Sequence, residues 1–108
     1  MRDGQDFTST VRRGRKVAQP LLVAHVVPGS GADVDRPTSV GFVVSKAVGP
    51  AVTRNRVKRR LRHAMRDRLT AVPSGSRVVV RALPAAAGAD FGELSDQLDA
   101  ALHRAGAR

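Results

Sequence analysis

The segment from residue 54 to residue 68 constrains the fold of this chain more than any other stretch. It carries eight Lys or Arg residues and a single acid, and neither Gly nor Pro interrupts it. These residues favour a helix, which we expect to run from Arg54 to about Leu69. Thr53 is a fair N-cap, and Pro73-Ser74-Gly75 ends the segment. At about 100° per residue, four apolar side chains share one arc and predict the core-facing side: Val57, Leu61, Ala64 and Met65.

The other side of this predicted helix is cationic over more than two turns. A charge run is ordinarily a solvated face, but a solvated helix usually mixes signs at i,i+4, and this one repeats like charges there. The stabilising partner is therefore expected outside the chain. Asn55 adds an amide that can bond to a base or sugar among phosphate contacts. The stripe predicts a nucleic-acid surface: Asn55, Arg59, Arg62 and Arg66 in line, with Arg56, Arg60 and His63 beside them.

The overall charge also indicates a polyanion partner. The chain has 19 Lys and Arg against 9 Asp and Glu, a net charge of +10, and most of these cations are Arg, which suits bidentate phosphate contacts. The aromatic residues are three Phe, with no Trp or Tyr, which is poor for stacking bases on a broad platform. The absence of Cys excludes a zinc finger, an iron–sulfur site, a disulfide scaffold and a thiol nucleophile.

The length predicts one domain over residues 1–108. No apolar run approaches the roughly 18 residues of a membrane span, and the first residues do not form a signal peptide, so we expect a cytoplasmic protein. Catalysis by side chains is poorly supported, because no pair of acids stands beside a core-facing His and the three histidines lack metal-ligand spacing. We expect no catalytic residue and no metal ligand. His25 is either a half-buried strand residue or a contact in a cleft.

The remaining elements alternate between helix and strand signals. We expect a short helix over residues 6–17, strands over 20–27, 39–45 and 77–83, and an Ala-rich linker over 84–88. The first two strands are expected to pair as an antiparallel hairpin with a long loop, which gives the order αββαβα.

A last helix is expected to begin at Asp90, with Glu93 completing a capping box. Phe42 and Phe91 are expected in the core. The apolar stripe of this helix has helical spacing: Phe91, Leu94, Leu98 and Leu102.

One combination of residues closely resembles the bacterial ribonuclease P protein subunit. It consists of Val40-Gly41-Phe42-Val43-Val44-Ser45-Lys46, Gly49, Ala51-Val52, Arg54-Asn55-Arg56-Val57-Lys58-Arg59 and Arg62. The resemblance covers most of the chain. It implies a single-domain α+β sandwich in the order αβββαβα, a ribosomal-protein-like fold with a left-handed βαβ crossover. That is one strand more than the residues separate, to be sought in residues 17–27 or 30–45.

The resemblance also implies a function. The family removes the 5′ leader of precursor tRNA by endonucleolytic cleavage, and its RNA subunit hydrolyses the phosphodiester with bound Mg²⁺. The protein itself would need no cofactor. Its partners would be ribonuclease P RNA and precursor tRNA, with no membrane and no small-molecule substrate. The residues implied to contact the catalytic RNA are Ser45, Lys46, Arg54, Asn55, Arg56, Lys58, Arg59, Arg60, Arg62 and Arg66.

A second implied site is a cleft for the leader. Here the chain departs from its relatives, because Val11 stands where a second aromatic is frequent and His25 where a strand Tyr is common. Ala47 also replaces a frequent Lys. Base stacking is therefore expected to be weaker, and cations to contribute more. Phe7 is either core or cleft-lining. The residues implied in this cleft are Phe7, Val11, Arg12, Arg13, Arg15 and His25.

Two other classes of function fit the charge alone. One is a non-enzymatic RNA-binding or ribosome-associated protein with the same surface, and the other is a basic DNA-binding protein. The Ser45-Lys46 and Arg54-Asn55-Arg56 motifs favour the ribonucleoprotein enzyme over both.

Overall fold

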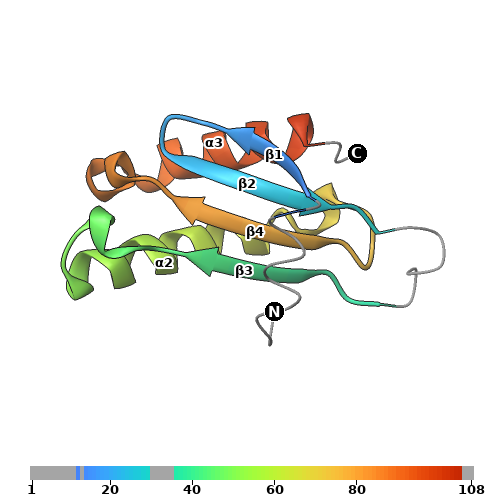
Figure 1. The fold of residues 1–108 in the computed structure, drawn as a ribbon, viewed down its shortest axis with the longest axis horizontal. Helices are drawn as coiled ribbons and strands as arrows, with labels where there is room; N and C mark the ends of the chain where they lie inside the picture. The colour runs from blue at the N-terminus through green and yellow to red at the C-terminus, as the bar shows by residue number, and fades with distance from the viewer. Residues whose placement is uncertain (1–11, 13, 30–35, 106–108) are drawn as a thin grey trace.

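The computed structural model describes residue 12, residues 14–29 and residues 36–105. Within these ranges four strands form one sheet, and two long helices and three short 3-10 helices accompany it (Figure 1). The strands are β1 (Arg15–Ala18), β2 (Leu22–Val27), β3 (Ser39–Val43) and β4 (Arg77–Ala82). The helices are α2 (Ala51–Arg66) and α3 (Phe91–Arg104), with the 3-10 helices η2 (Lys46–Val48), η3 (Leu69–Ala71) and η4 (Pro84–Gly88).

The strand order is β1-β2-β4-β3, so β4 lies between the two strands that were expected to pair. β1 with β2 and β2 with β4 are antiparallel, whereas β3 with β4 is parallel. The expected hairpin of residues 20–27 and 39–45 is therefore wrong. The long connection between β2 and β3 does not force them to be neighbours. The strongly apolar β4, with Val78, Val79 and Val80 buried, takes an inner position.

The parallel pair β3 and β4 is joined through α2, and this crossover is left-handed. In Figure 1 both strands run to the left, α2 lies behind the sheet, and β4 lies above β3, where a right-handed connection would place it below. Most such connections are right-handed, because a right-twisted strand that feeds a helix packs back on the sheet most readily in that sense. The handedness implied by the family resemblance is thus confirmed.

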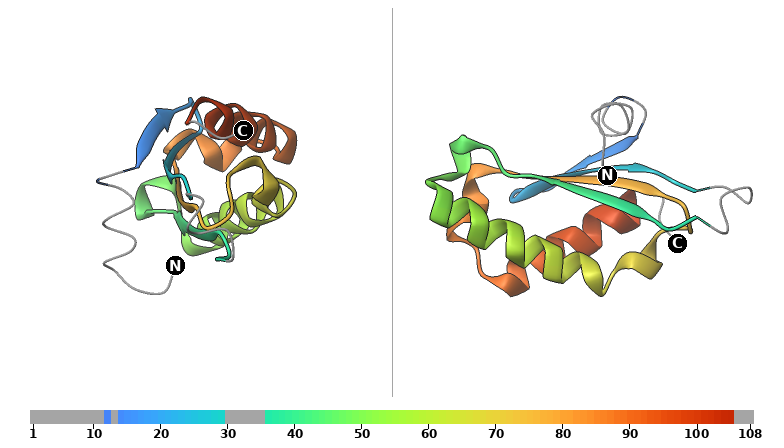
Figure 2. Two further views of the ribbon diagram at one scale, coloured as in Figure 1. Left: turned by 90° about the vertical axis from the view of Figure 1, so that its right-hand side faces the viewer. Right: turned by 90° about the horizontal axis from the view of Figure 1, so that it is seen from below.

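Both long helices cover the same face of the sheet, as the second view of Figure 2 shows. The core lies between these two layers. The predicted core face of α2 is confirmed, because Val57, Leu61 and Ala64 are fully buried and Met65 nearly so. The stripe of α3 is also buried at Leu94, Leu98 and Leu102. Its first residue, Phe91, is 44% exposed, which corrects the expectation that it lies in the core.

Several boundaries differ from the expectations. α2 begins at Ala51 after Pro50, so Thr53 lies inside the helix and is not its cap. Proline suits this position because its fixed φ is compatible with a helix start and the first amides need no partner within the helix. The predicted capping box of α3 is confirmed, since the Asp90 carboxylate accepts from the Glu93 amide and the Glu93 carboxylate from the Asp90 amide.

The chain near its beginning contains the strand that the residues alone did not separate. Residues 15–17, expected at the end of a first helix, belong to β1. Arg12 is helical and Gly14 lies in a bend, and the remaining residues of the expected helix, 6–11 and 13, lie outside the described residues. The Ala-rich linker is the 3-10 helix η4, anchored by the buried Ala86. None of the helices in the described ranges is long and apolar enough to cross a bilayer.

Candidate nucleic-acid interface

A tight turn connects β3 to α2. The amides of Val48 and Gly49 donate to the carbonyl oxygens of Ser45 and Lys46 at 3.0 and 3.1 Å, and the Val48 side chain is buried. Gly49 has φ +151°, a conformation that only glycine adopts readily. A Cβ at this position would also meet the Thr53 side chain at 3.2 Å. Gly49 therefore sets the direction of α2 and leaves Ser45 and Lys46 exposed at its start.

The exposed side of α2 carries the first candidate surface. A shallow, open depression of about 530 Å³ is lined by Val52, Asn55, Lys58, Arg59 and Arg62. Three of these five residues are cations and none is acidic, so the depression attracts anions. The apolar Val52 is 78% exposed among them. Arg66 continues the exposed line one turn further along the helix, so the stripe predicted from the spacing of 55, 59, 62 and 66 is solvent-facing.

Two other predicted contacts of α2 have partners within the chain. Arg56 donates from Nη2 to the carbonyl oxygen of Ala87 at 3.1 Å, and Arg60 donates from Nη1 to that of Ala89 at 2.7 Å. Both carbonyls lie in or just after η4, so these arginines fasten α2 to that segment. Arg54 is likewise half-buried. These three side chains present less of their charge to an external partner than their exposed neighbours do.

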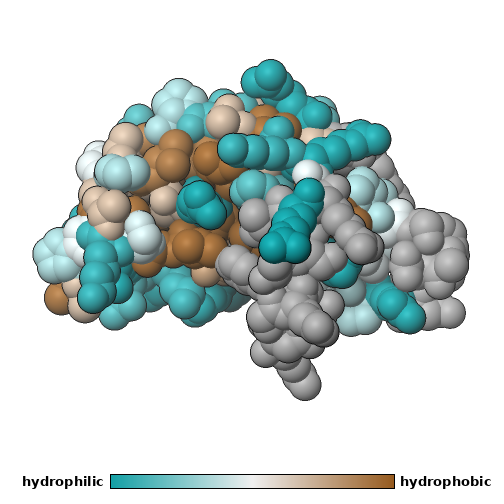
Figure 3. Space-filling view, in the orientation of Figure 1, coloured by the Kyte–Doolittle hydropathy of each residue, from teal (hydrophilic) through white to brown (hydrophobic). Residues whose placement is uncertain are grey.

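The second candidate surface is the face of the sheet opposite the helices, which we call the open face. Side chains alternate between faces along a strand. The register pairs Lys16 with His25 and His25 with Val79, and it pairs Val23 with Arg81. All five therefore share the open face. Figure 3 looks onto this side and shows a hydrophobic patch with hydrophilic side chains set into it and along its rim.

His25 lies at the centre of this group. The residue is only 4% exposed, and its Nδ1 is buried with no hydrogen-bond partner among the described residues. Burial lowers the pKa of His25 below its ordinary value of 6.5, and the neighbouring charges of Arg81 and Lys16 lower it further. The imidazole is therefore neutral near pH 7. Of the two alternatives for His25, a half-buried strand position and a cleft contact, the structure gives a fully buried position on the open face.

The structure does not bring all of the expected leader-site residues together. Arg15 pairs with Val26, a core residue, so it lies on the helix-covered side of the edge strand, away from His25. Arg12 is exposed. The expected residues Phe7, Val11 and Arg13 lie outside the described residues.

Sequence reasoning missed Arg81 and did not relate Lys16 to His25. Their relation to His25 depends on the pairing of three strands, and no spacing along the chain reveals it. The only local signal was that each is a cation next to apolar strand residues, with Arg81 directly after Val78-Val79-Val80.

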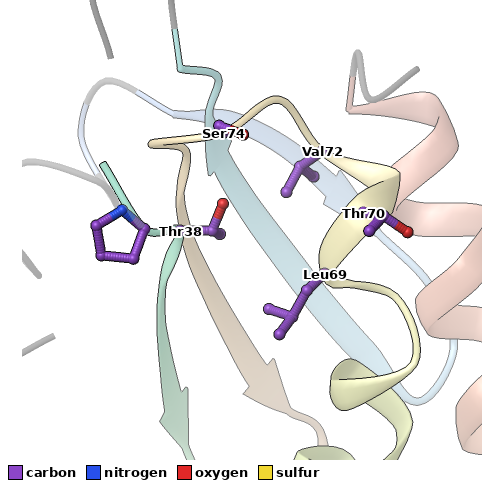
Figure 4. Close-up of a pocket in the computed structure, with 6 residues that line it drawn as sticks. Thr38, Leu69, Thr70, Val72 and Ser74 are labelled. Atoms are coloured by element: carbon purple, nitrogen blue, oxygen red, sulfur yellow. The ribbon is translucent and has the colours of Figure 1, made fainter. Parts of the chain in front are cut away.

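A separate hollow lies at the other end of the sheet, and its lining residues carry no charge (Figure 4). Its volume is about 260 Å³. Leu69, the first residue of η3, and Val72, directly after η3, point toward Thr38, which precedes β3. It contains none of the predicted site residues. The described parts of the chain also hold no group of three or more His, Asp or Glu that could bind a metal ion.

Known proteins are similar to this chain over most of its length. The family model described as Ribonuclease P matches residues 1–106. The ribonuclease P protein component of Streptomyces avermitilis is 55% identical over 112 residues, which cover 96% of this chain and 89% of that protein. The corresponding component of Nocardioides sp. is 48% identical over 107 residues, covering 99% of this chain and 91% of its relative.

Solved structures of the same kind share the fold. The Staphylococcus aureus RNase P protein has a TM-score of 0.83 at 23% identity, over 99% of this chain and 94% of that one. The RNase P protein of Thermotoga maritima, solved in complex with 1-(4-fluorophenyl)-2-thiourea, has a TM-score of 0.80 at 25% identity, over 96% and 97%. The match of the family model over nearly the whole length, together with the close relatives, shows that this chain belongs to the ribonuclease P protein family.

Proposed function

We propose that this chain is the protein subunit of a ribonuclease P that removes the 5′ leader of precursor tRNA. The observation that carries the proposal is the exposed depression on α2, with Asn55 among Lys58, Arg59 and Arg62. Cations contact phosphates without reading sequence, and an amide adds hydrogen bonds to a sugar or base. This combination supports binding to a structured RNA, with Ser45 and Lys46 exposed at the start of the same helix and Arg66 one turn beyond.

The proposed division of labour leaves the chemistry to the RNA subunit. Mg²⁺ would be held there, as the family resemblance implies. The contribution of the protein is electrostatic. Two polyanions, the catalytic RNA and its substrate, repel each other, and a chain with a net charge of +10 reduces that repulsion. Less Mg²⁺ is then needed for the two to associate. The place of action that we propose is the bacterial cytoplasm, where precursor tRNA is made.

The open face of the sheet is the proposed contact for the leader. It is separate from the α2 depression, since the core-facing side of α2 packs under the sheet and the stripe of Asn55, Arg59 and Arg62 points roughly the opposite way. Two RNAs can therefore bind at once. The half-buried Arg56 and Arg60 are proposed to hold α2 in place for the first contact.

The test is reconstitution with a bacterial ribonuclease P RNA and a precursor tRNA at low Mg²⁺. We expect the wild-type chain to stimulate leader removal. The double variant Arg59→Ala/Arg62→Ala should stimulate poorly, whereas Arg104→Ala, which removes an exposed cation at the end of α3, should behave as wild type.

Two outcomes would contradict the proposal. No stimulation by the wild-type chain would exclude the role in ribonuclease P and favour a ribosome-associated RNA-binding protein, which could be checked by co-sedimentation with ribosomal subunits. Preferential binding to duplex DNA at the same salt concentration would favour a DNA-binding protein.

A further inference from the structure

The open face contains a group of side chains that the fold alone does not explain. An uncharged His is buried between two exposed cations, and its Nδ1 has no partner among the described residues. Unsatisfied polar atoms in the interior are uncommon because each costs free energy. Two cations beside it make the arrangement less favourable still. Among the described residues, no acidic side chain shares the open face with these three groups.

We propose that Lys16 and Arg81 together bind one phosphodiester of the 5′ leader, over the floor that His25 and Val23 form between them. This inference rests on the proposed function and adds the residues that hold the strand. Lys16, on β1, and Arg81, on β4, flank His25 on β2 from opposite sides, because the register places Lys16 directly across from His25 and Arg81 on the diagonal.

The spacing suits one shared anion. Neighbouring strands are about 4.8 Å apart and rise about 3.4 Å per residue, so two strands across and two residues along place the backbones of Lys16 and Arg81 about 12 Å apart. Both side chains are long enough to lean inward from that separation, and both are exposed. An Arg offers several donors in a planar fork and a Lys offers three, which suits the oxygens of a phosphate.

The chemistry of the floor favours a phosphate over a stacked base. On the described part of the open face the side chains beside His25 are aliphatic, Val23 and Val79, and Phe42 lies on the helix-covered side. The His25 ring is only 4% exposed, which leaves a base little aromatic surface to stack on. Among the described residues of this face, Lys16 and Arg81 are the exposed cations.

An anion would also ease the position of His25. With a phosphate between Lys16 and Arg81, the two cations are neutralised and no longer lower the pKa of His25, whereas burial, the larger cause, remains.

The test measures the affinity of the holoenzyme for precursor tRNA with a short leader and for mature tRNA. Lys16→Ala and Arg81→Ala should each lower the affinity for precursor by about threefold to tenfold and leave mature tRNA unchanged. The matched control is Arg104→Ala, an exposed cation on α3, which should change neither. Circular dichroism and the thermal midpoint establish that the variants are folded.

A second measurement identifies the phosphate. Leaders that carry a single uncharged methylphosphonate linkage, moved one position at a time, should weaken wild-type binding strongly at one position. At that position Lys16→Ala and Arg81→Ala should cause little further loss, because the charge they bind is already gone.

The outcomes separate this inference from the proposed function. A wild-type holoenzyme that prefers precursor to mature tRNA, with variants that keep the full preference, would overturn the phosphate site alone. If Lys16→Ala loses its effect at one methylphosphonate position and Arg81→Ala at another, the two cations bind different phosphates, and the shared phosphate is overturned. A wild-type chain that neither binds the catalytic RNA nor stimulates cleavage would overturn the proposed function itself.

Discussion

The guanidinium of Arg60 donates a hydrogen bond from Nη1 to the main-chain carbonyl oxygen of Ala89 at 2.7 Å. Arg59, its neighbour on α2, is exposed and lines the α2 depression. Adjacent cations in one basic run thus have different surroundings. Arg60 joins α2 to the segment that leads into α3, and Arg59 faces solvent.

We expect Arg60→Ala to lower the free energy of unfolding by about 1–2 kcal/mol, because a charge-assisted hydrogen bond is lost and the carbonyl is left without that donor. Arg59→Ala should change stability by less than about 0.5 kcal/mol. Urea denaturation of the two variants gives the comparison. Equal destabilisation by both substitutions would show that the bond to Ala89 contributes nothing in solution.

The exposed cations of α2 should determine how strongly RNA binding depends on salt. Arg59→Ala and Arg62→Ala are each expected to reduce the slope of log K against log[salt] by about 0.7–0.9, the value for one lost phosphate contact. Asn55→Ala should weaken binding to ribonuclease P RNA and leave the slope unchanged, because an amide releases no counterion. Filter binding over a salt series measures both quantities. An Arg59→Ala slope equal to that of wild type would contradict its assignment as a phosphate contact.

Gly49 should tolerate no side chain. Gly49→Ala forces a residue with a Cβ to adopt φ +151° and presses that atom to 3.2 Å from the Thr53 side chain. We expect a loss of about 1–3 kcal/mol in the free energy of unfolding. Gly88→Ala is the matched control, because a Cβ there meets nothing within 4 Å, and it should be close to neutral. A thermal midpoint of Gly49→Ala at or above that of Gly88→Ala would show that the turn relaxes at little cost.

The buried His25 should make the fold less stable in mild acid. Its pKa in the folded state is lowered below 6.5 by burial and by Arg81 and Lys16, so the unfolded chain takes up the proton first as the pH falls. The stabilising contribution is complete above about pH 6.5 and is lost as the pH falls from there through the folded-state pKa. The free energy of unfolding should therefore decline between pH 7 and pH 5.

The matched variant for this effect is His25→Gln, which is polar and cannot titrate. Its stability at pH 7 can differ from wild type, but its decline toward pH 5 should be shallower. His63 and His103 are exposed and remain in both proteins. If the free energy of unfolding declines equally in the two proteins between pH 7 and pH 5, His25 is excluded as the source of the pH dependence.

Local patterns predicted the parts of the structure that depend on local chemistry. The burial of Val57 and Leu61 follows from helical periodicity, and the cap at Asp90 follows from its spacing to Glu93. The exposure of Phe91 was missed because periodicity continues to the first residue of a helix, whereas the covering layer does not extend that far.

The remaining features depend on contacts between distant segments. The inner position of β4 and the parallel pairing with β3 are set by the whole sheet, and so is the grouping of Lys16 with Arg81. The bonds of Arg56 and Arg60 require the position of η4, about thirty residues further along the chain. In a basic run these two arginines cannot be distinguished from Arg59 or Arg62 by residue type.

The two-layer packing of α2 against the sheet has a mechanical consequence. The α2 depression and the open face are carried by elements that one core holds at a fixed separation, through fully buried residues such as Leu61 and Val80. Under the proposed function, the domain fixes the distance between the catalytic RNA and the leader. A substitution that thickens or thins this core would shift one bound RNA relative to the other, and with it the phosphodiester that reaches the catalytic centre.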